Sequence, residues 1–148
     1  GALPVAGTAL VQARDLSTVA VAVSIPAFFL TFNLLLLNEF PDQEADRHGG
    51  RRNLVHRFGR EGEALIFVVA AIAVPVSVVG AIAIGVLPLF AAIGVLPSAL
   101  LVRPIDWAIR RPESSVPVAA LRDNVVWIIG TNALLAVGLL LSTAGVPV

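Results

Sequence analysis

The longest uncharged stretch of this sequence, residues 64–102, sets the strongest limit on its fold. A helix needs roughly 20 apolar residues to cross a bilayer, so this stretch is about twice as long as one span. We therefore predict two membrane-spanning helices, at about 63–83 and 87–102, joined by a very short turn near 85–88. The chain is 14% charged, whereas soluble domains have about 25% charged residues. The predicted class is an all-α integral membrane protein.

Two further apolar segments complete the predicted bundle. Residues 18–38 form one span, which Pro26 should kink because proline lacks an N–H donor and clashes with the preceding turn. Residues 124–144 form the last span. Residues 1–13 are too short to cross, so we expect the chain to begin partway through a helix, as a piece of a longer protein. The expected fold is a polytopic transmembrane helical bundle of about four full spans plus a partial N-terminal helix, in a single membrane domain over 1–148.

The charged residues predict the orientation of this bundle. Two loops, 39–62 and 103–123, carry nine of the ten arginines, and the two spans between them place both loops on one side. Positive charge marks the cytoplasmic side, so we predict a protein of the cell inner membrane with both loops in the cytoplasm. A formal net charge of zero argues against a nucleic-acid partner. The lack of cysteine excludes disulfides and thiolate metal sites.

The first charged loop begins with polar side chains at helical spacing. Asn38, Asp42 and Asp46 stand at i, i+4 and i+8, which places them on one stripe of a helix with neighbouring Cβ atoms about 5–6 Å apart. Two carboxylates so close repel each other unless a cation lies between them. Mg²⁺ suits such a site because it takes oxygen ligands and is commonly shared with substrate phosphates. Pro41 lacks an N–H, so we expect a helix to begin again there.

Arginines behind these acids predict a phosphate site. Arg51, Arg52 and Arg57 follow a break at Gly49 and Gly50 that can fold the chain back. Guanidinium groups bind phosphate oxygens bidentately. Carboxylates for a metal, arginines for phosphate and an apolar bundle below them describe a diphosphate with a lipid tail. The matching chemistry is ionisation of an allylic diphosphate, in which the metal and the arginines stabilise charge on the leaving group and the apolar cavity shields the carbocation.

Simpler interpretations stand beside this one. A charged loop between two spans is most often a solvated connector, and Asp42 and Asp46 could pair with Arg47 and Arg51 in an exposed network worth little. The remaining polar and aromatic residues are predicted to have structural roles. We predict polar loop residues at His48 and His56, interhelical hydrogen-bond partners at Thr31 and Asn33, and membrane-interface anchors at Trp107 and Trp127. We further predict a local helical pair between Asp106 and Arg110, and topology determinants at Arg103, Arg111 and Arg122.

The first charged loop resembles the second aspartate-rich motif of the UbiA superfamily of intramembrane prenyltransferases. Arg51 stands where that family usually has lysine, and Asn53 where threonine is common. The opening of the chain is similar to the dihydroxynaphthoate (menaquinone-pathway) branch, except that Ala9 and Leu10 replace a frequent aromatic pair. The residues that match the motif in register are Asn38, Asp42, Asp46, Arg47, Gly50, Leu54, Arg57 and Gly59.

This resemblance implies a nine-helix fold of which the chain supplies the C-terminal half. It implies a Mg²⁺-dependent prenyltransferase that moves an isoprenyl group from its diphosphate to an aromatic acceptor in quinone biosynthesis, inactive without the missing N-terminal half. Asp42 and Asp46 would be the catalytic metal ligands, with Asn38 a supporting ligand or orienting group. The residues expected to bind substrate are Asn38, Arg47, Arg51, Arg52 and Arg57.

Two other functional classes fit the same composition. One is a non-catalytic membrane module whose charged loops bind anionic lipid or a partner subunit. The other is half of a small transporter or channel, and against it we predict that no span carries a buried ionisable residue to line a pathway.

Overall fold

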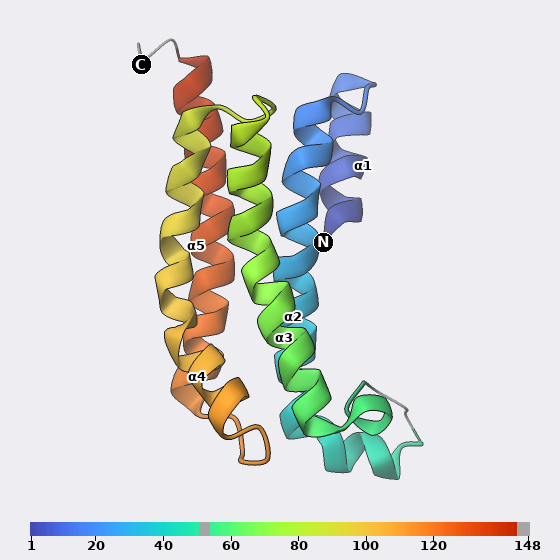
Figure 1. The fold of residues 1–148 in the computed structure, drawn as a ribbon. Coiled ribbons are helices and arrows are strands. Elements are labelled where there is room, and N and C mark those ends of the chain that lie inside the picture. Colours follow the sequence, from blue (N-terminus) through green and yellow to red (C-terminus); the bar gives the residue numbers. More distant parts are fainter. Residues whose placement is uncertain (51–53, 145–148) are drawn as a thin grey trace.

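The structure is a computed structural model that describes residues 1–50 and 54–144, without the side chains of 42–47, 55 and 56. Within this part every regular element is a helix, which confirms the all-α class (Figure 1). Four helical segments are long and apolar enough to cross a membrane, and a shorter apolar helix precedes them. The helices are α1 (Ala2–Ala13), α2 (Thr18–His48), α3 (Leu54–Ala83), the 3-10 helix η1 (Leu89–Leu101), α4 (Val102–Arg110) and α5 (Val118–Thr143).

The long helices lie side by side, with α3 between α2 on one side and η1 and α5 on the other (Figure 1). The α2–α3 connection and the α4–α5 connection lie at the same end of the bundle, as the charge pattern predicted. The turn after α3 and the turn between α1 and α2 lie at the opposite end. The bundle is therefore polar at one end and apolar along its length.

The turn at 84–88 confirms the predicted break in the uncharged run. Gly85 has φ 73°, a left-handed conformation that a residue without Cβ adopts at little cost. Pro88 is extended and precedes η1. The N–H groups of Val86 and Leu87 both donate to the carbonyl of Ala81, so the end of α3 is closed by its own backbone.

The helix bounds differ from the prediction in the charged regions. α2 passes through Pro26 and Pro41 to His48 without a restart, so the helix beginning predicted at Pro41 is wrong. A proline removes one backbone N–H from a helix but does not by itself end it, and Leu37 and Phe40, in the turn before Pro41, are buried against α3 and α4. Likewise α3 begins at Leu54 rather than near 63, with non-helical backbone at Gly59 (φ 71°, ψ 171°), and α5 begins six residues earlier than predicted.

Buried side chains form three layers along the bundle axis. The layer at the charged end joins α2, α3 and α4 through residues such as Leu36, Phe67 and Trp107. A middle layer is built around Leu30 and Trp127, and a third lies near the 84–88 turn. Large aliphatic side chains between 60% and 68% exposed cover the outside and are suited to contact lipid: Leu35, Leu65, Val69, Val76, Leu96, Ile129 and Leu140.

η1 and α5 approach each other so closely that glycine is required between them. A Cβ atom added to Gly94 would lie 2.5 Å from Cγ of Leu135, and one added to Gly138 would overlap the carbonyl of Phe90. Close backbone approach at small residues is typical of helix packing in membranes. This contact fixes η1 and α4, which follows it directly, against α5.

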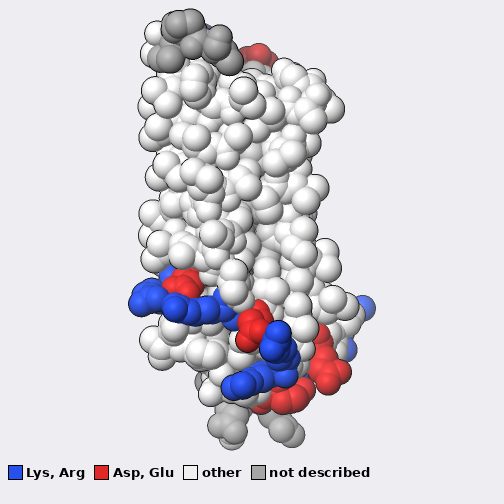
Figure 2. All heavy atoms as spheres, turned by 60° about the vertical axis from the view of Figure 1, so that its left-hand side comes forward, with Lys and Arg blue, Asp and Glu red and all other residues white. Residues whose placement is uncertain are grey.

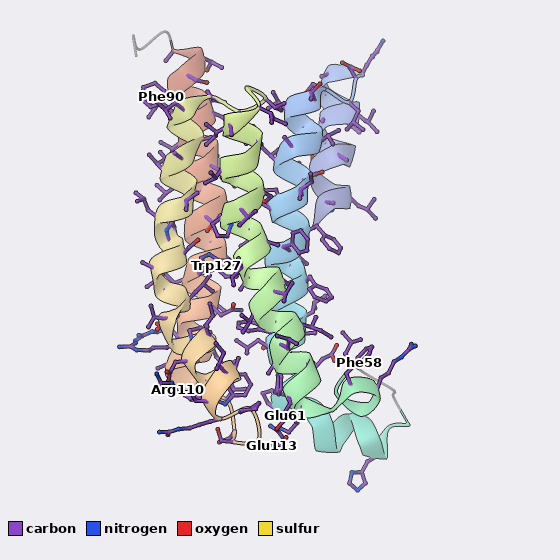
Figure 3. The ribbon with its side chains drawn as sticks, viewed as in Figure 1. Phe58, Glu61, Phe90, Arg110, Glu113 and Trp127 are labelled. Carbon is purple, nitrogen blue, oxygen red and sulfur yellow. The ribbon has the colours of Figure 1, made fainter. Side chains whose placement is uncertain are left out.

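Both tryptophans lie inside the protein rather than at its surface. Trp127 is fully buried, and its indole N–H donates to Ser98 Oγ at 3.3 Å. Trp107 is 3% exposed, stacks edge-on against Phe40 with 4.8 Å between ring centroids, and donates to Ser114 Oγ at 3.1 Å. Their prediction as interface anchors is therefore wrong, because both rings are buried and each N–H finds a partner within the protein. Figure 3 shows Trp127 among the helices, away from both ends of the bundle.

Candidate active site

The charged side chains of the bundle gather at the end where the α2–α3 and α4–α5 connections lie. In the view of Figure 2, arginine and acidic atoms cover that end, while the surface above it is uncharged until the opposite tip. The predicted metal and phosphate residues lie in and around the α2–α3 connection, and the α4–α5 connection lies at the same end of the bundle.

The predicted metal ligands lie on one continuous helix. Because α2 is helical from Thr18 to His48, positions 38, 42 and 46 follow one another turn by turn, as the spacing predicted. The side chain of Asn38 is exposed. The side chains of Asp42 and Asp46 lie outside the described part, and among the side chains it includes no group of three potential metal ligands occurs. The metal site stays a prediction.

The predicted phosphate ligands are only partly described. Arg51 and Arg52 lie outside the described residues, as does the side chain of Arg47. Arg57 is exposed, with its guanidinium carbon 5.5 Å from the ring centre of Phe58. An exposed guanidinium over a ring keeps N–H donors for a second ligand. Arg57 is therefore the predicted phosphate residue whose described position is compatible with that role.

A carboxylate that sequence reasoning assigned no role closes the base of this connection. Glu39 Oε2 accepts a hydrogen bond from the backbone N–H of Leu54 at 3.1 Å, which joins the first residue of α3 to α2. The N–H groups in the first turn of a helix lack partners within that helix, and a carboxylate there satisfies one of them. Asp42 and the predicted ligands that follow it, up to Arg52, lie between Glu39 and Leu54 in the sequence. Glu39 therefore fixes where this segment leaves and re-enters the bundle.

Glu63 was also missed, and it overturns one prediction. It lies within the candidate span Arg57–Ala83, is fully buried, and neither carboxyl oxygen has a hydrogen-bond partner in the described part of the chain. A carboxylate that is buried without a partner is costly, which sets Glu63 apart from the other acids of the described part. The expectation that no span carries a buried ionisable residue is wrong. Glu63 stands four residues before Phe67, which places both side chains on the same, buried face of α3. This spacing was the signal in the sequence that could have predicted the burial of Glu63.

Arg60 links the two charged connections. Its Nε donates to the carbonyl of Pro112 at 3.0 Å, one terminal nitrogen donates to the carbonyl of Ser114 at 3.4 Å, and its guanidinium carbon lies 5.7 Å from the Phe40 ring centre. The start of α3 is thereby tied to the loop before α5. These contacts give Arg60 a structural role.

The α4–α5 connection has its own ion pairs. Asp106 and Arg110 form the predicted helical pair, at 2.9 Å. Asp123, which is 5% exposed, accepts from Arg103 at 3.0 Å and from Arg122 at 2.9 Å. Arg103 and Arg122, two of the three arginines predicted to set topology, thus also neutralise a carboxylate at the start of α5.

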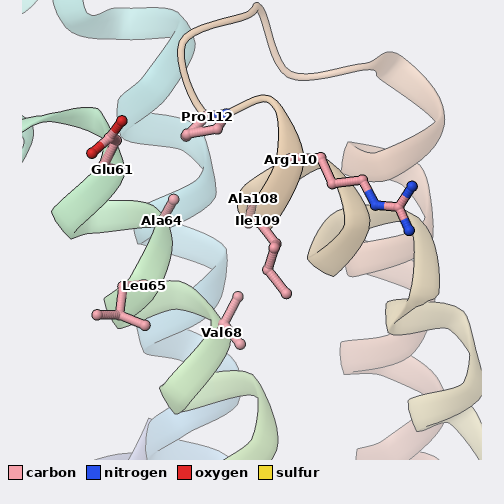
Figure 4. Close-up of a pocket in the computed structure, with 8 residues that line it drawn as sticks. All are labelled: Glu61, Ala64, Leu65, Val68, Ala108, Ile109, Arg110 and Pro112. Atoms are coloured by element: carbon pink, nitrogen blue, oxygen red, sulfur yellow. The ribbon is translucent and has the colours of Figure 1, made fainter.

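A groove of about 430 Å³ separates α3 from α4 at the charged end. Ala64, Leu65 and Val68 of α3 face Ile109 of α4 across it, and Glu61 and Arg110 stand at its outer edge with their charged groups pointing apart (Figure 4). An apolar groove of this kind suits a hydrocarbon chain. It lies beside the segment that bears the predicted ligands, because Glu61 and Ala64 belong to the first turns of α3.

Several polar atoms deeper in the bundle are buried without partners. Both amide atoms of Asn33 and the Oγ1 of Thr131 make no hydrogen bond in the described part of the chain, and the same holds for Asn124 Oδ1. Thr31 makes no side-chain hydrogen bond with described residues either. The interhelical hydrogen bonds predicted for Thr31 and Asn33 do not occur in the described part of the chain, where the neighbouring α2 and α3 faces meet through apolar residues such as Leu30 and Ala71.

Comparison with known proteins gives one match. The family model described as "UbiA prenyltransferase family" matches residues 1–129, which include α1 to α4 and the first half of α5. Comparison with curated proteins found no match, and comparison with solved structures found none either.

Proposed function

We propose, since the chain belongs to the UbiA prenyltransferase family, that it transfers an isoprenyl group from its diphosphate to an aromatic acceptor within the membrane. The observation that carries the proposal is the unbroken α2 helix, which spaces positions 38, 42 and 46 one turn apart at the polar end of an apolar bundle. Quinone biosynthesis of the menaquinone type is the finer proposal, and it rests on the resemblance of the opening segment.

The donor set fits a hard divalent cation. Two carboxylates and one amide at successive turns offer oxygen ligands, the kind that Mg²⁺ prefers. Asp42 and Asp46 would hold the ion, with Asn38 supporting or orienting the site. When bound, the ion would neutralise charge on the diphosphate.

The chain's own residues would do the remaining work. Arg57 and its predicted companions Arg47, Arg51 and Arg52 would bind phosphate oxygens as the bond between the allylic carbon and the diphosphate oxygen breaks and the oxygen keeps the electron pair. The apolar groove between α3 and α4 would hold the hydrocarbon chain away from water. The acceptor ring would form the new carbon–carbon bond and lose a proton.

A transfer assay tests this proposal. The protein, as encoded with any flanking sequence retained, is incubated with a radiolabelled isoprenyl diphosphate and 1,4-dihydroxy-2-naphthoate, with Mg²⁺ or with a chelator. We expect transfer that requires Mg²⁺ and that falls at least about a hundredfold in Asp42→Asn and in Asp46→Asn. Glu44→Gln is the matched control, because position 44 lies between these acids in sequence but off their helical stripe. Asp42→Asn and Asp46→Asn rates equal to that of Glu44→Gln would refute the assignment.

We also propose that the charged end faces the cytoplasm. All arginines except Arg14 lie in or beside the two connections at that end. The chain has no cysteine, so a single introduced cysteine reports its own side. On intact cells, an impermeant maleimide should label Ser17→Cys and spare Ser115→Cys; the reverse pattern would contradict the orientation.

A further inference from the structure

The short helix α4 is flanked by two grooves of different character. The α3–α4 groove described above carries one acidic and one basic residue at its edge. The second groove, between α4 and α5, has a volume of about 470 Å³. Its polar lining comes from Arg103, Asp106, Arg111, Ser114 and Ser115.

The ion pairs of this region leave positive charge at the α4–α5 groove. The one carboxylate that lines it, that of Asp106, is already paired with Arg110. Asp123 is shared between Arg103 and Arg122, and the Arg103 side chain remains 62% exposed despite that contact. Arg111 is exposed and forms no salt bridge with any residue that the structure describes. The guanidinium groups of Arg103, in the first turn of α4, and Arg111, at its end, thus keep N–H donors for an anion.

The surroundings of the groove combine this charge with exposed apolar surface. Val102, which lines the groove, is 70% exposed, and Val118, in the first turn of α5, is 81% exposed. In Figure 2 the charged atoms of this face adjoin the uncharged surface of the membrane-spanning helices. A ligand that fits must offer an anionic group beside an apolar one. Phospholipids with an anionic headgroup have this form, and basic pockets between membrane helices bind such headgroups.

We propose that the α4–α5 groove binds the headgroup of an anionic phospholipid. Arg103 and Arg111 bind the phosphate oxygens, the Ser115 hydroxyl is a further donor, and Val102 contacts the start of an acyl chain. This site is distinct from the predicted diphosphate site, because α4 and Trp107 lie between the groove and the end of α2. The proposal does not depend on transferase activity.

Tryptophan quenching by brominated lipid tests the proposal directly. Trp107 lines the groove, whereas Trp127 is buried in the middle layer and contributes a constant background. The protein is placed in phosphatidylcholine nanodiscs, and phosphatidylglycerol brominated near the headgroup end of its acyl chains is titrated in. We expect stronger quenching than with brominated phosphatidylcholine. In the Arg103→Gln/Arg111→Gln double variant, apparent affinity should fall roughly thirtyfold, since each arginine near the surface contributes about fivefold.

Two further variants serve as matched controls. Asp106→Asn/Arg110→Gln removes the ion pair of the same helix without changing net charge, and Arg14→Gln removes an arginine at the opposite end. Both should retain the preference for phosphatidylglycerol. If Arg103→Gln/Arg111→Gln does not fold, Arg111→Gln alone replaces it, because that side chain has no ion pair among described residues to lose.

Four results would overturn the proposal. These are equal quenching by the two lipids in the unmodified protein, a loss in Asp106→Asn/Arg110→Gln as large as in Arg103→Gln/Arg111→Gln, displacement of the lipid by soluble glycerol phosphate, and a change of oligomeric mass in Arg103→Gln/Arg111→Gln. The third result would assign the groove to a soluble phosphate. The fourth would assign it to a partner subunit.

Discussion

The two connections at the charged end use their acids in opposite ways. In the α4–α5 connection, Asp106 and Asp123 are both paired with arginines at 3.0 Å or less. Beside the α2–α3 connection, Glu63 is fully buried without a hydrogen-bond partner among the described residues, and neither it nor Glu39 forms a salt bridge with a residue that the structure describes. A carboxylate paired with arginine helps to hold a loop in place, whereas a buried carboxylate without a partner is unfavourable. The comparison separates a connection held by ion pairs from one that leaves a buried carboxylate unpaired.

The largest expected effect is a dissociation between activity and stability. We expect Asp42→Asn to lower prenyl transfer at least about a hundredfold with little change in the thermal unfolding midpoint. Asp123→Asn should do the reverse, because it removes the acceptor shared by Arg103 and Arg122 but touches no predicted ligand. Unfolding in detergent and the transfer assay measure the two quantities on the same samples. A matching loss of both quantities in both variants would erase the distinction between the connections.

The next effect tests whether packing joins the two connections. Trp107→Ala removes a buried ring that contacts Phe40 of α2, so we expect the free energy of unfolding to fall by about 3–5 kcal/mol. Trp107→Phe keeps the ring contact and loses the hydrogen bond to Ser114, and should cost only about 1 kcal/mol. Reversible unfolding in mixed micelles gives both values. Ile109→Ala, at a 66% exposed position of the same helix, is the control, and a loss equal to that of Trp107→Ala would contradict the role of the ring.

The smallest effect concerns the hydrogen bond that closes the α2–α3 connection. Glu39→Ala leaves the Leu54 N–H without its acceptor, so the segment between them should open more often. A hydrogen bond to a charged group contributes enough free energy for roughly tenfold faster tryptic cleavage after Arg51 or Arg52. Cleavage rates are measured by mass spectrometry of timed digests. Glu61→Ala is the matched control, and equal rates in the two variants would exclude a closing role for Glu39.

Local pattern was enough to predict much of this fold. The spans, the turn at 85–88 and the Asp106–Arg110 pair each depend on residues close together in the chain, and each was confirmed. The helical spacing of 38, 42 and 46 was likewise confirmed at the level of the backbone. The restart predicted at Pro41 failed because a proline costs a helix one backbone hydrogen bond without necessarily ending it.

The sequence by itself determined the membrane bundle and the collection of charge at one end, because hydrophobic run length and charge position act locally. Only the tertiary structure decided that Glu63 is fully buried, that Arg60 reaches Pro112 and Ser114, and that Trp127 meets Ser98. Each of these features depends on elements that lie far apart in the chain. The partner of such a side chain is chosen by how the helices pack, which no periodicity within one helix contains.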